Sequence, residues 1–85
     1  MPWAVSNMIS MVDPDSPELA YIQLADALGK RIISGEITGR MPSERALAEE
    51  YGVAYGTVRR AMALLRERGL VESVHGRGTF ATPPA

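Results

Sequence analysis

The residues best suited to chemistry in this sequence are arginines set beside glycines and hydroxyl side chains, in two short stretches. The first, GVAYGTVRRAM over residues 52–62, carries the adjacent Arg59 and Arg60. The second, HGRG over residues 75–78, places one histidine and one arginine among glycines. Guanidinium groups bind phosphates and the edge of guanine, and glycines allow a close approach to a nucleic-acid backbone. Both stretches therefore favour binding to a polyanion.

Nucleophilic, acid–base and metal chemistry have little support in this sequence. The chain has a single histidine, His75, and no cysteine, so it offers neither a thiolate nor a histidine cluster. Active sites bring several such groups together, and no paired carboxylates fall on one face of a predicted helix. The GRG of residues 76–78 is not a nucleotide-binding loop, because no helix follows it. We therefore expect no enzyme activity, no cofactor and no metal site.

The composition indicates one small globular domain. The chain has 85 residues, of which 46% are hydrophobic and 22% charged, as in ordinary globular proteins. No apolar run approaches the length of a membrane helix, and residues 1–12 lack the cationic start of a secretory signal. The absence of cysteine is consistent with a reducing compartment. We expect a cytoplasmic protein with no membrane partner.

The distribution of charge favours an anionic partner more than the net charge of −1 does. Residues 1–29 carry four acidic side chains and no basic one, whereas residues 51–85 carry five arginines and two glutamates. Such an asymmetry orients a protein on an anionic partner. A solvated helix of mixed charge would give the same pattern, so charge alone does not decide between these interpretations.

The first of three predicted helices has clear signals at both ends. It starts with Ser16 as N-cap and Pro17 at the first helical position, and it ends at Ser34-Gly35. Gly29 inside it costs about 1 kcal/mol relative to alanine, so this helix must depend on packing. Its apolar residues recur on one face: Tyr21, Leu24, Ala25, Leu28 and Ile32.

The second and third helices are predicted to form a helix-turn-helix. Ser43 is a ready N-cap, Gly52 ends the second helix in a left-handed turn, and the third helix covers about residues 55–68. Small Ala48 falls where the two helices cross closely, and the branched Val58 packs the third helix onto the second. This geometry offers the first turn of the third helix to the major groove of DNA. An ordinary helical hairpin is the alternative.

The last element is predicted to be a β-hairpin. Residues 71–74 and 79–81 are short extended runs around the glycine-rich tip His75-Gly76-Arg77-Gly78. A hairpin with a cationic tip directly after a helix-turn-helix makes a winged helix. We therefore predict a mainly α fold with a small β-hairpin (α+β), a three-helix winged helix-turn-helix.

The chain divides into three parts on this interpretation. Residues 1–15 form an apolar N-terminal tail, either mobile or an arm that docks on the domain or on a second copy. Residues 16–82 form the winged helix-turn-helix, and residues 83–85 form the C-terminal end.

Several motifs, in this order, resemble the N-terminal DNA-binding domain of the GntR family of bacterial transcription regulators: YIQLADALGKRIISGEI, MPSERALAEEYGV, TVRRAMALLRERGLVE and HGRGTF. The resemblance covers roughly residues 16–82. It implies a sequence-specific regulator of transcription, a repressor, that binds double-stranded operator DNA, usually as a dimer on a palindrome. The third helix, about residues 55–68, would enter the major groove, and the wing, residues 71–81, would reach the minor groove.

The resemblance also implies which residues contact DNA. Arg45 matches an arginine that reaches phosphate or guanine, Thr57 would bond a phosphate, and Arg59 would contact backbone or a guanine edge. His75 and Gly76 match the wing tip. Position by position, the family pattern points to Ser43, Arg45, Thr57, Arg59, His75, Gly76 and Arg77, and Tyr55, Gly56 and Arg60 join the candidate site through the third helix.

Three of these candidates have a plain structural alternative. Arg45 stands four residues before Glu49, the spacing of an ion pair on a helix surface. Arg59 would also suit a solvated helix face. His75 would also suit a loop in which it has no function.

The sequence departs from the family pattern at the start of the third helix. The family has a hydroxyl residue, an arginine and a threonine where this chain has Ala54, Tyr55 and Gly56. Losing the N-cap side chain costs about 0.5–2 kcal/mol. Tyr55 can stack, donate through its hydroxyl or touch a thymine methyl, so the base preference should not be copied from the family. The loop GEITGRMP is also shorter than usual, which leaves the family's small strand before Met41 open.

A domain expected from the family is missing from this sequence. Family members carry a C-terminal domain that binds a metabolite and dimerises, whereas this chain ends at Ala85, as a stand-alone regulator or as a piece of a longer one. We therefore expect no small-molecule effector domain and a monomer that pairs on DNA. The alternative function is a winged helix used for protein–protein contact without DNA binding. The cations of the third helix and the wing favour DNA: Arg45, Arg59, Arg60 and Arg77.

Overall fold

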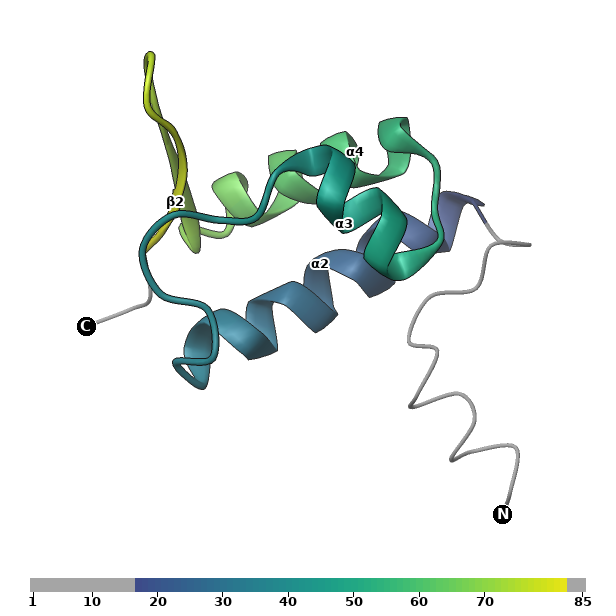
Figure 1. Ribbon diagram of the computed structural model, residues 1–85. Coiled ribbons are helices and arrows are strands. Elements are labelled where there is room, and N and C mark those ends of the chain that lie inside the picture. The colour runs from purple at the N-terminus through teal and green to yellow at the C-terminus, as the bar shows by residue number, and fades with distance from the viewer. Residues whose placement is uncertain (1–16, 83–85) are drawn as a thin grey trace.

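The computed structural model describes residues 17–82, which form three helices followed by a two-stranded antiparallel hairpin (Figure 1). The predicted N-terminal tail, the N-cap at Ser16 and residues 83–85 lie outside the described residues. The predicted mainly α fold, a winged helix-turn-helix, is confirmed. In chain order the elements are α2 (Pro17–Ile33), α3 (Glu44–Tyr51), α4 (Tyr55–Glu67), β1 (Val71–Val74) and β2 (Gly78–Ala81).

The core lies between α2 and α4 and is completed by α3. Full burial of a large apolar side chain contributes about 1.5–3 kcal/mol, so the large buried side chains of this core supply most of the driving force for folding. Gly29 is buried in α2, and a Cβ there would lie 3.2 Å from Leu70 Cδ1, so glycine allows the segment after α4 to pack closely against this helix. The largest fully buried side chains are Leu24, Leu28, Ile32, Leu47, Val58, Met62 and Leu65.

The helix-turn-helix has the end signals that the sequence predicts. The Ser43 hydroxyl accepts a hydrogen bond from the Ala46 N–H at 3.0 Å, which caps α3. Gly52 has φ 65°, a left-handed conformation, and its N–H bonds to the Ala48 carbonyl. The chain then turns sharply and enters α4, which packs on α3 through the fully buried Val58.

The two ends of α4 differ in how well they are capped. Ala54 has the extended backbone of an N-cap, with φ −66° and ψ 150°, but no side chain caps this end. At the other end Gly69 is left-handed, with φ 76°, and the Leu70 N–H bonds to the Leu65 carbonyl at 2.9 Å. The helix ends at Glu67, with Arg68 as its C-cap, in agreement with the predicted end near residue 68.

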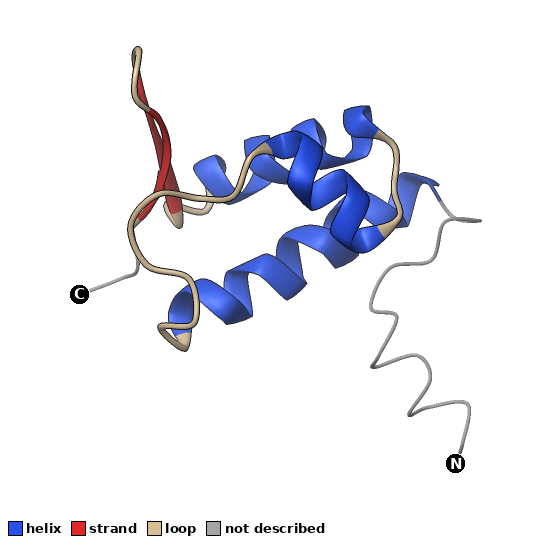
Figure 2. Ribbon diagram, in the orientation of Figure 1, coloured by secondary structure: helices blue, strands red, loops and turns tan. Residues whose placement is uncertain are grey.

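The hairpin projects from the helical body at the end of α4 far from the α3–α4 turn (Figure 2). Its register pairs Val71 with Ala81 and Val74 with Gly78. The second strand therefore begins at Gly78, one residue before the predicted Thr79, because this glycine still pairs with β1. The tip is confined to residues 75–77.

The loop before α3 reaches the hairpin but does not form a third strand. Arg40 makes an isolated bridge to Phe80. The Met41 N–H bonds to the Thr79 carbonyl at 2.8 Å, and the Ala81 N–H bonds to the Gly39 carbonyl at 2.7 Å. The short loop left undecided whether the family's small strand before Met41 is present. In the structure this strand is reduced to one bridge.

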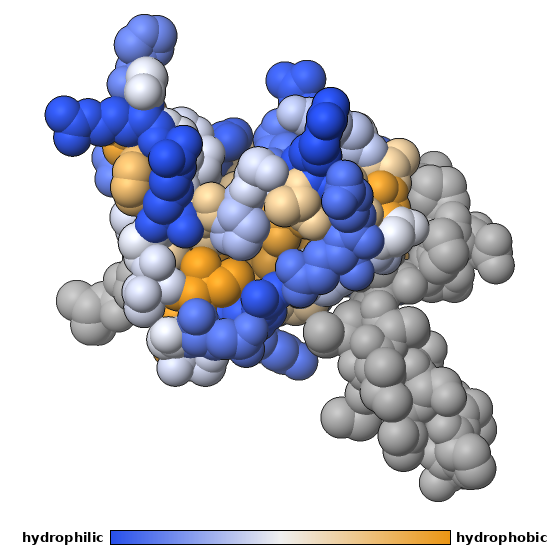
Figure 3. Space-filling view, in the orientation of Figure 1, coloured by the Kyte–Doolittle hydropathy of each residue, from blue (hydrophilic) through white to orange (hydrophobic). Residues whose placement is uncertain are grey.

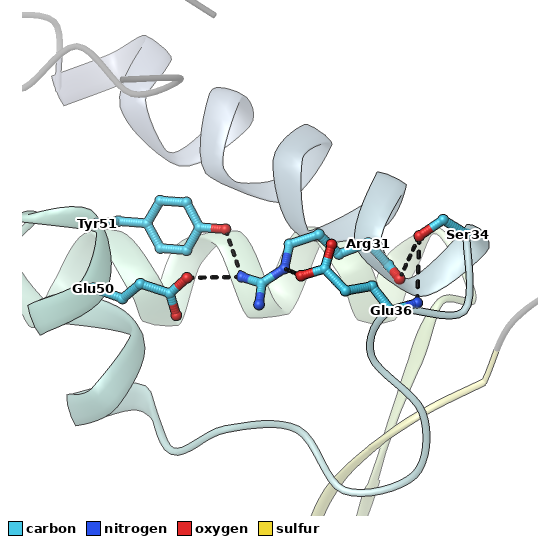
Figure 4. A network of polar contacts seen from close by, with 5 residues as sticks. All are labelled: Arg31, Ser34, Glu36, Glu50 and Tyr51. Carbon is cyan, nitrogen blue, oxygen red and sulfur yellow. Dashed lines mark hydrogen bonds and ion pairs between the residues drawn. The ribbon is translucent and has the colours of Figure 1, made fainter. Parts of the chain in front are cut away.

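A polar network around Arg31 joins the end of α2 to the end of α3 (Figure 4). The guanidinium donates to Glu36 at 2.6 Å, to Glu50 at 3.0 Å and to the Tyr51 hydroxyl at 2.9 Å. Partial burial opposes the charge, but the hydrogen bonds to Tyr51 and Glu36 outweigh it and raise the pKa of Arg31. Arg31 therefore stays charged and holds α3 in place against α2.

Candidate nucleic-acid interface

Arg59 and Arg60, adjacent in the sequence, serve different sides of α4. Successive residues on a helix point about 100° apart. The guanidinium of Arg60 lies 4.2 Å from the centroid of the Tyr21 ring on α2, a cation–π contact. Arg59 is exposed one turn after Tyr55, on the side of α4 that carries Tyr55. The two arginines therefore lie on different sides of α4.

The pKa of Tyr55 is affected by one acidic and two basic side chains at the starts of α3 and α4: Glu44, Arg45 and Arg59. A hydrogen bond to Glu44 raises the pKa of Tyr55, and the nearby charges of Arg59 and Arg45 act in the opposite direction. The second residue of α3 and the fifth of α4 thus bring two cations to one place. An exposed aromatic ring stands beside them, since Tyr55 is 51% exposed.

Small residues flank Tyr55 and leave its surroundings open. Ala54 and Gly56 are both exposed, and a Cβ at Gly56 would meet nothing within 4 Å. Thr57 is half-buried, and its N–H bonds to the Ala54 carbonyl at 3.0 Å, within the first turn of the helix. Glycine at position 56 is therefore not required by packing or by backbone conformation, and it leaves the first turn of α4 free for a close contact.

Ser43 and Arg45 lie at the start of α3. The Ser43 hydroxyl accepts the capping hydrogen bond of α3, and Ser43 is exposed, so the hydroxyl can also donate to a group outside the chain. Arg45 is exposed, and within residues 17–82 the ion pairs are those of Arg31 and Arg68, so Arg45 does not pair with Glu49. The ion pair with Glu49 that the sequence offered as an alternative is therefore not formed among residues 17–82.

The wing presents His75, Gly76 and Arg77 at its tip, all exposed. The Arg77 N–H closes the turn on the Val74 carbonyl at 2.9 Å. Gly76 has φ 75°, a conformation that side chains with a Cβ rarely adopt, so the turn itself requires glycine here. The tip is thus a compact turn that carries one cation and one imidazole.

Two arginines that brace the wing were not singled out from the sequence. Arg66 in the last turn of α4 donates through Nε to the Ser73 hydroxyl on β1 at 3.0 Å. Arg40 extends over Gly78 on β2, where a Cβ would lie 3.2 Å from its Nε. Neither contact has a local sequence signal, because each depends on where the hairpin lies relative to the helices.

The candidate residues are brought to two neighbouring regions. In Figure 3, hydrophilic side chains cover the wing and much of α3 and α4, and hydrophobic surface shows between them. Ser43 and Arg45 lie at the start of α3, and the other candidates of the first region lie in the first turns of α4: Tyr55, Gly56, Thr57 and Arg59. The wing tip forms the second region, while Arg60 lies apart from both, against α2.

Other kinds of site find no support among residues 17–82. No group of three or more histidine, cysteine, aspartate or glutamate side chains there is arranged to hold a metal ion. None of the helices in this part of the chain combines the length and the apolar character needed to cross a bilayer.

Comparisons with known proteins agree with this architecture. The family described as "Bacterial regulatory proteins, gntR family" matches residues 20–81. The HTH-type transcriptional repressor NagR of Bacillus subtilis is 39% identical over 75 residues, which are 86% of this chain and 31% of NagR. An uncharacterized HTH-type transcriptional regulator of Rhizobium meliloti is 51% identical over 60 residues, 68% of this chain and 25% of that protein. The chain thus spans a quarter to a third of the length of these relatives.

A solved structure gives the same result for the fold. The DNA-binding domain of AraR, crystallised in complex with an operator, superposes with a TM-score of 0.67 at 34% sequence identity. The match covers 73% of this chain and 77% of the AraR chain. The winged helix is therefore supported by an independent structure as well as by the sequence.

Proposed function

This chain belongs to the gntR family of bacterial regulatory proteins, and we propose that residues 16–82 form a unit that binds double-stranded DNA sequence-specifically. The observation that carries the proposal is a set of arginines with no carboxylate partner among residues 17–82. Arg45, Arg59 and Arg77 lie on α3, α4 and the wing, and none forms an ion pair with a described residue. Unpaired cations on three adjoining elements suit the closely spaced phosphates of a duplex.

Each element has a separate task in this proposal. The start of α4 enters the major groove, where Arg59 meets a guanine edge or the backbone, and the wing tip reaches the minor groove. Ser43 and Thr57 bond phosphates and set the orientation, while Arg45 reaches phosphate or guanine. Tyr55 takes the place of the arginine that the family has there, so this chain reads at least one base pair differently.

The biological role follows from DNA binding and is equally a proposal. NagR is named a transcriptional repressor, and so is MngR of Escherichia coli, 40% identical over 62 residues. We assign this chain the same kind of role, repression of transcription in the bacterial cytoplasm, and no catalytic activity. Two copies would bind the two halves of a palindromic operator, because symmetric dimers require symmetric sites.

A winged helix used only for protein–protein contact is the competing function. Such a module has no need of unpaired arginines on both α4 and the wing, so their presence favours DNA. The two functions differ in one cheap measurement, which is a gel shift on random duplex DNA at low salt. Binding there supports the DNA function, and its absence supports the protein contact.

Two experiments test the proposed function in full. The affinity for duplex DNA must fall with salt, with a log–log slope of about 0.9 for each phosphate neutralised. A flat salt response would remove the proposal. Selection of bound sequences from a random pool then gives the base preference, and a pool with no enriched motif would exclude sequence-specific binding.

A further inference from the structure

A groove of about 380 Å³ opens between the start of α3 and the wing. Its walls include Arg40 and Ser43 on one side and Gly78 and Thr79 of β2 on the other, with Glu44 and the buried Met62 also lining it. Of the wing-tip residues singled out from the sequence, Gly78 lines this groove, whereas His75, Gly76 and Arg77 are not among its lining residues. The groove lies between the two regions that the proposed function assigns to DNA.

The guanidinium of Arg40 lies over Gly78 at this groove. A Cβ at Gly78 would lie 3.2 Å from Arg40 Nε and 3.4 Å from Nη2, so the side chain crosses the space that glycine leaves empty. Gly78 also has φ 106°, which a residue with a side chain rarely adopts. The backbone bridge to Phe80 fixes the other end of Arg40. The absence of a side chain at Gly78 thus leaves room for the Arg40 guanidinium against β2.

Arg40 has no partner for its charge within the described part of the chain. It is exposed, and it takes part in none of the ion pairs or side-chain hydrogen bonds of residues 17–82. The one carboxylate among the residues that line the groove, Glu44, forms no ion pair with Arg40. An exposed guanidinium without a carboxylate partner suits an incoming oxyanion, because its fork of N–H groups matches phosphate oxygens.

The geometry of a duplex indicates which part of the DNA backbone would lie near Arg40. A helix in the major groove and a wing in the adjacent minor groove lie on either side of one sugar–phosphate backbone. That backbone has to cross the surface between α4 and the wing, and the groove is lined by Met62 of α4 together with the start of α3 and β2. The start of α4 and the wing both project on the same side of the molecule in Figure 1.

Resting on the proposed function, we infer that Arg40 binds a backbone phosphate where the strand passes between the two grooves. The contact reads no base. It fixes the wing in register on the duplex, because Arg40 would touch the phosphate while lying against Gly78 of β2. Arg40 is therefore a positioning residue for DNA recognition.

The test compares three single variants of the whole chain on one duplex taken from the selected pool. Arg40→Gln removes the charge, Arg40→Lys keeps it, and Lys30→Gln removes a matched exposed cation from the outer side of α2. We expect the salt slope to fall by about 0.9 in Arg40→Gln and to stay unchanged in the other two. Thermal unfolding of each variant confirms that the fold is kept.

A scan of neutral methylphosphonates along the duplex, one phosphate at a time, then locates the contact. At one position, the methylphosphonate should weaken DNA binding by the wild-type chain but leave DNA binding by Arg40→Gln unchanged. An unchanged salt slope in Arg40→Gln would overturn the inference. So would a loss of salt slope in Arg40→Lys as large as that in Arg40→Gln. A changed base preference in Arg40→Gln would also overturn it, because the proposed contact reads no base. If the wild-type chain shows no salt-dependent binding at all, the proposed function itself fails, which is a different result.

Discussion

The guanidinium of Arg60 on α4 lies over the ring of Tyr21 on α2, 4.2 Å from its centroid. The ring is half-buried and packs on the core, so it is a fixed surface for the cation. A contact through the ring face leaves the N–H edge of the guanidinium exposed. Arg60 therefore links α4 to α2 while remaining exposed.

The first prediction concerns this pair. A double-mutant cycle of Arg60→Gln and Tyr21→Leu should give a coupling free energy of about 0.5–1 kcal/mol, because each change removes the same cation–π contact. Tyr21→Phe keeps the ring and should retain the coupling. Urea unfolding of the four proteins supplies the free energies. Additive effects would show that the two side chains are neighbours without interaction.

Local signals explain why so much of the fold could be predicted from the sequence. Ser43, Gly52 and Gly69 end or begin helices through hydrogen bonds to residues three to five positions away, so the sequence around each contains the whole cause. The apolar spacing of α2 and α4 likewise fixed which faces are buried. The wing followed from a glycine-rich tip between two short extended runs.

Contacts between distant segments explain what the sequence did not reveal. Arg40 meets Gly78 and Arg60 meets Tyr21 only because the helices and the hairpin pack in a particular way. No spacing rule joins such pairs, so the sequence alone does not separate Arg60 from Arg59 and carries no signal for the contact of Arg40. Gly29 is similar, since its need for glycine comes from Leu70, far along the chain.

The second prediction concerns the uncapped start of α4. Ala54 already has the extended backbone of an N-cap, so a serine there can accept a hydrogen bond without rearrangement. Ala54→Ser should raise the free energy of unfolding by about 1 kcal/mol, and Ser43→Ala, which removes the existing cap of α3, should lower it by a similar amount. Chemical denaturation measures both. If Ala54→Ser leaves stability unchanged while Ser43→Ala lowers it, the start of α4 is frayed.

The third prediction is a pH dependence at Tyr55. The hydrogen bond to Glu44 raises its pKa, so the neutral phenol is favoured in the folded protein. The stability that neutral Tyr55 contributes is therefore fully present below the ordinary tyrosine pKa, about 10. It is lost as the pH rises through the higher pKa that Tyr55 has in the folded protein.

An absorbance titration of the three tyrosines measures this effect. In Glu44→Gln one tyrosine should ionise at lower pH than in the wild-type chain. Tyr55→Phe identifies which of the three is responsible. Identical titration curves for Glu44→Gln and the wild-type chain would contradict the contact.

The fourth prediction concerns the network that joins α2 to α3. Arg31→Met keeps the apolar stem but removes the hydrogen bonds to Glu36, Glu50 and the Tyr51 hydroxyl. Both carboxylates are half-exposed or more, so solvent weakens their share. We expect a loss of about 1–2 kcal/mol in unfolding free energy. Lys30→Met, its exposed neighbour, should change stability by less than about 0.5 kcal/mol, and equal losses in the two variants would contradict a specific role for Arg31.

The last prediction concerns the number of copies that bind. A stable dimer buries well over about 1,000 Å² of surface, much of it apolar. Within residues 17–82 the inner faces of the three helices are used by the core, and the exposed large apolar side chains of α2 are Leu19, 55% exposed, and Ile33, 62% exposed. Two separate side chains on one helix are too few for such an interface. We therefore expect a monomer at micromolar concentration that pairs only on a palindromic site, with the two α4 helices about 34 Å apart, one turn of the duplex.

Analytical ultracentrifugation with and without the palindromic duplex tests this expectation. A duplex with one half-site scrambled is the matched control, and it should bind a single copy. A dimer in the absence of DNA would contradict the prediction and would place an interface either on the outer side of α2 or in the N-terminal segment. Ile33→Lys and a deletion of residues 1–12 separate those two origins, because only the change that touches the interface returns the protein to a monomer.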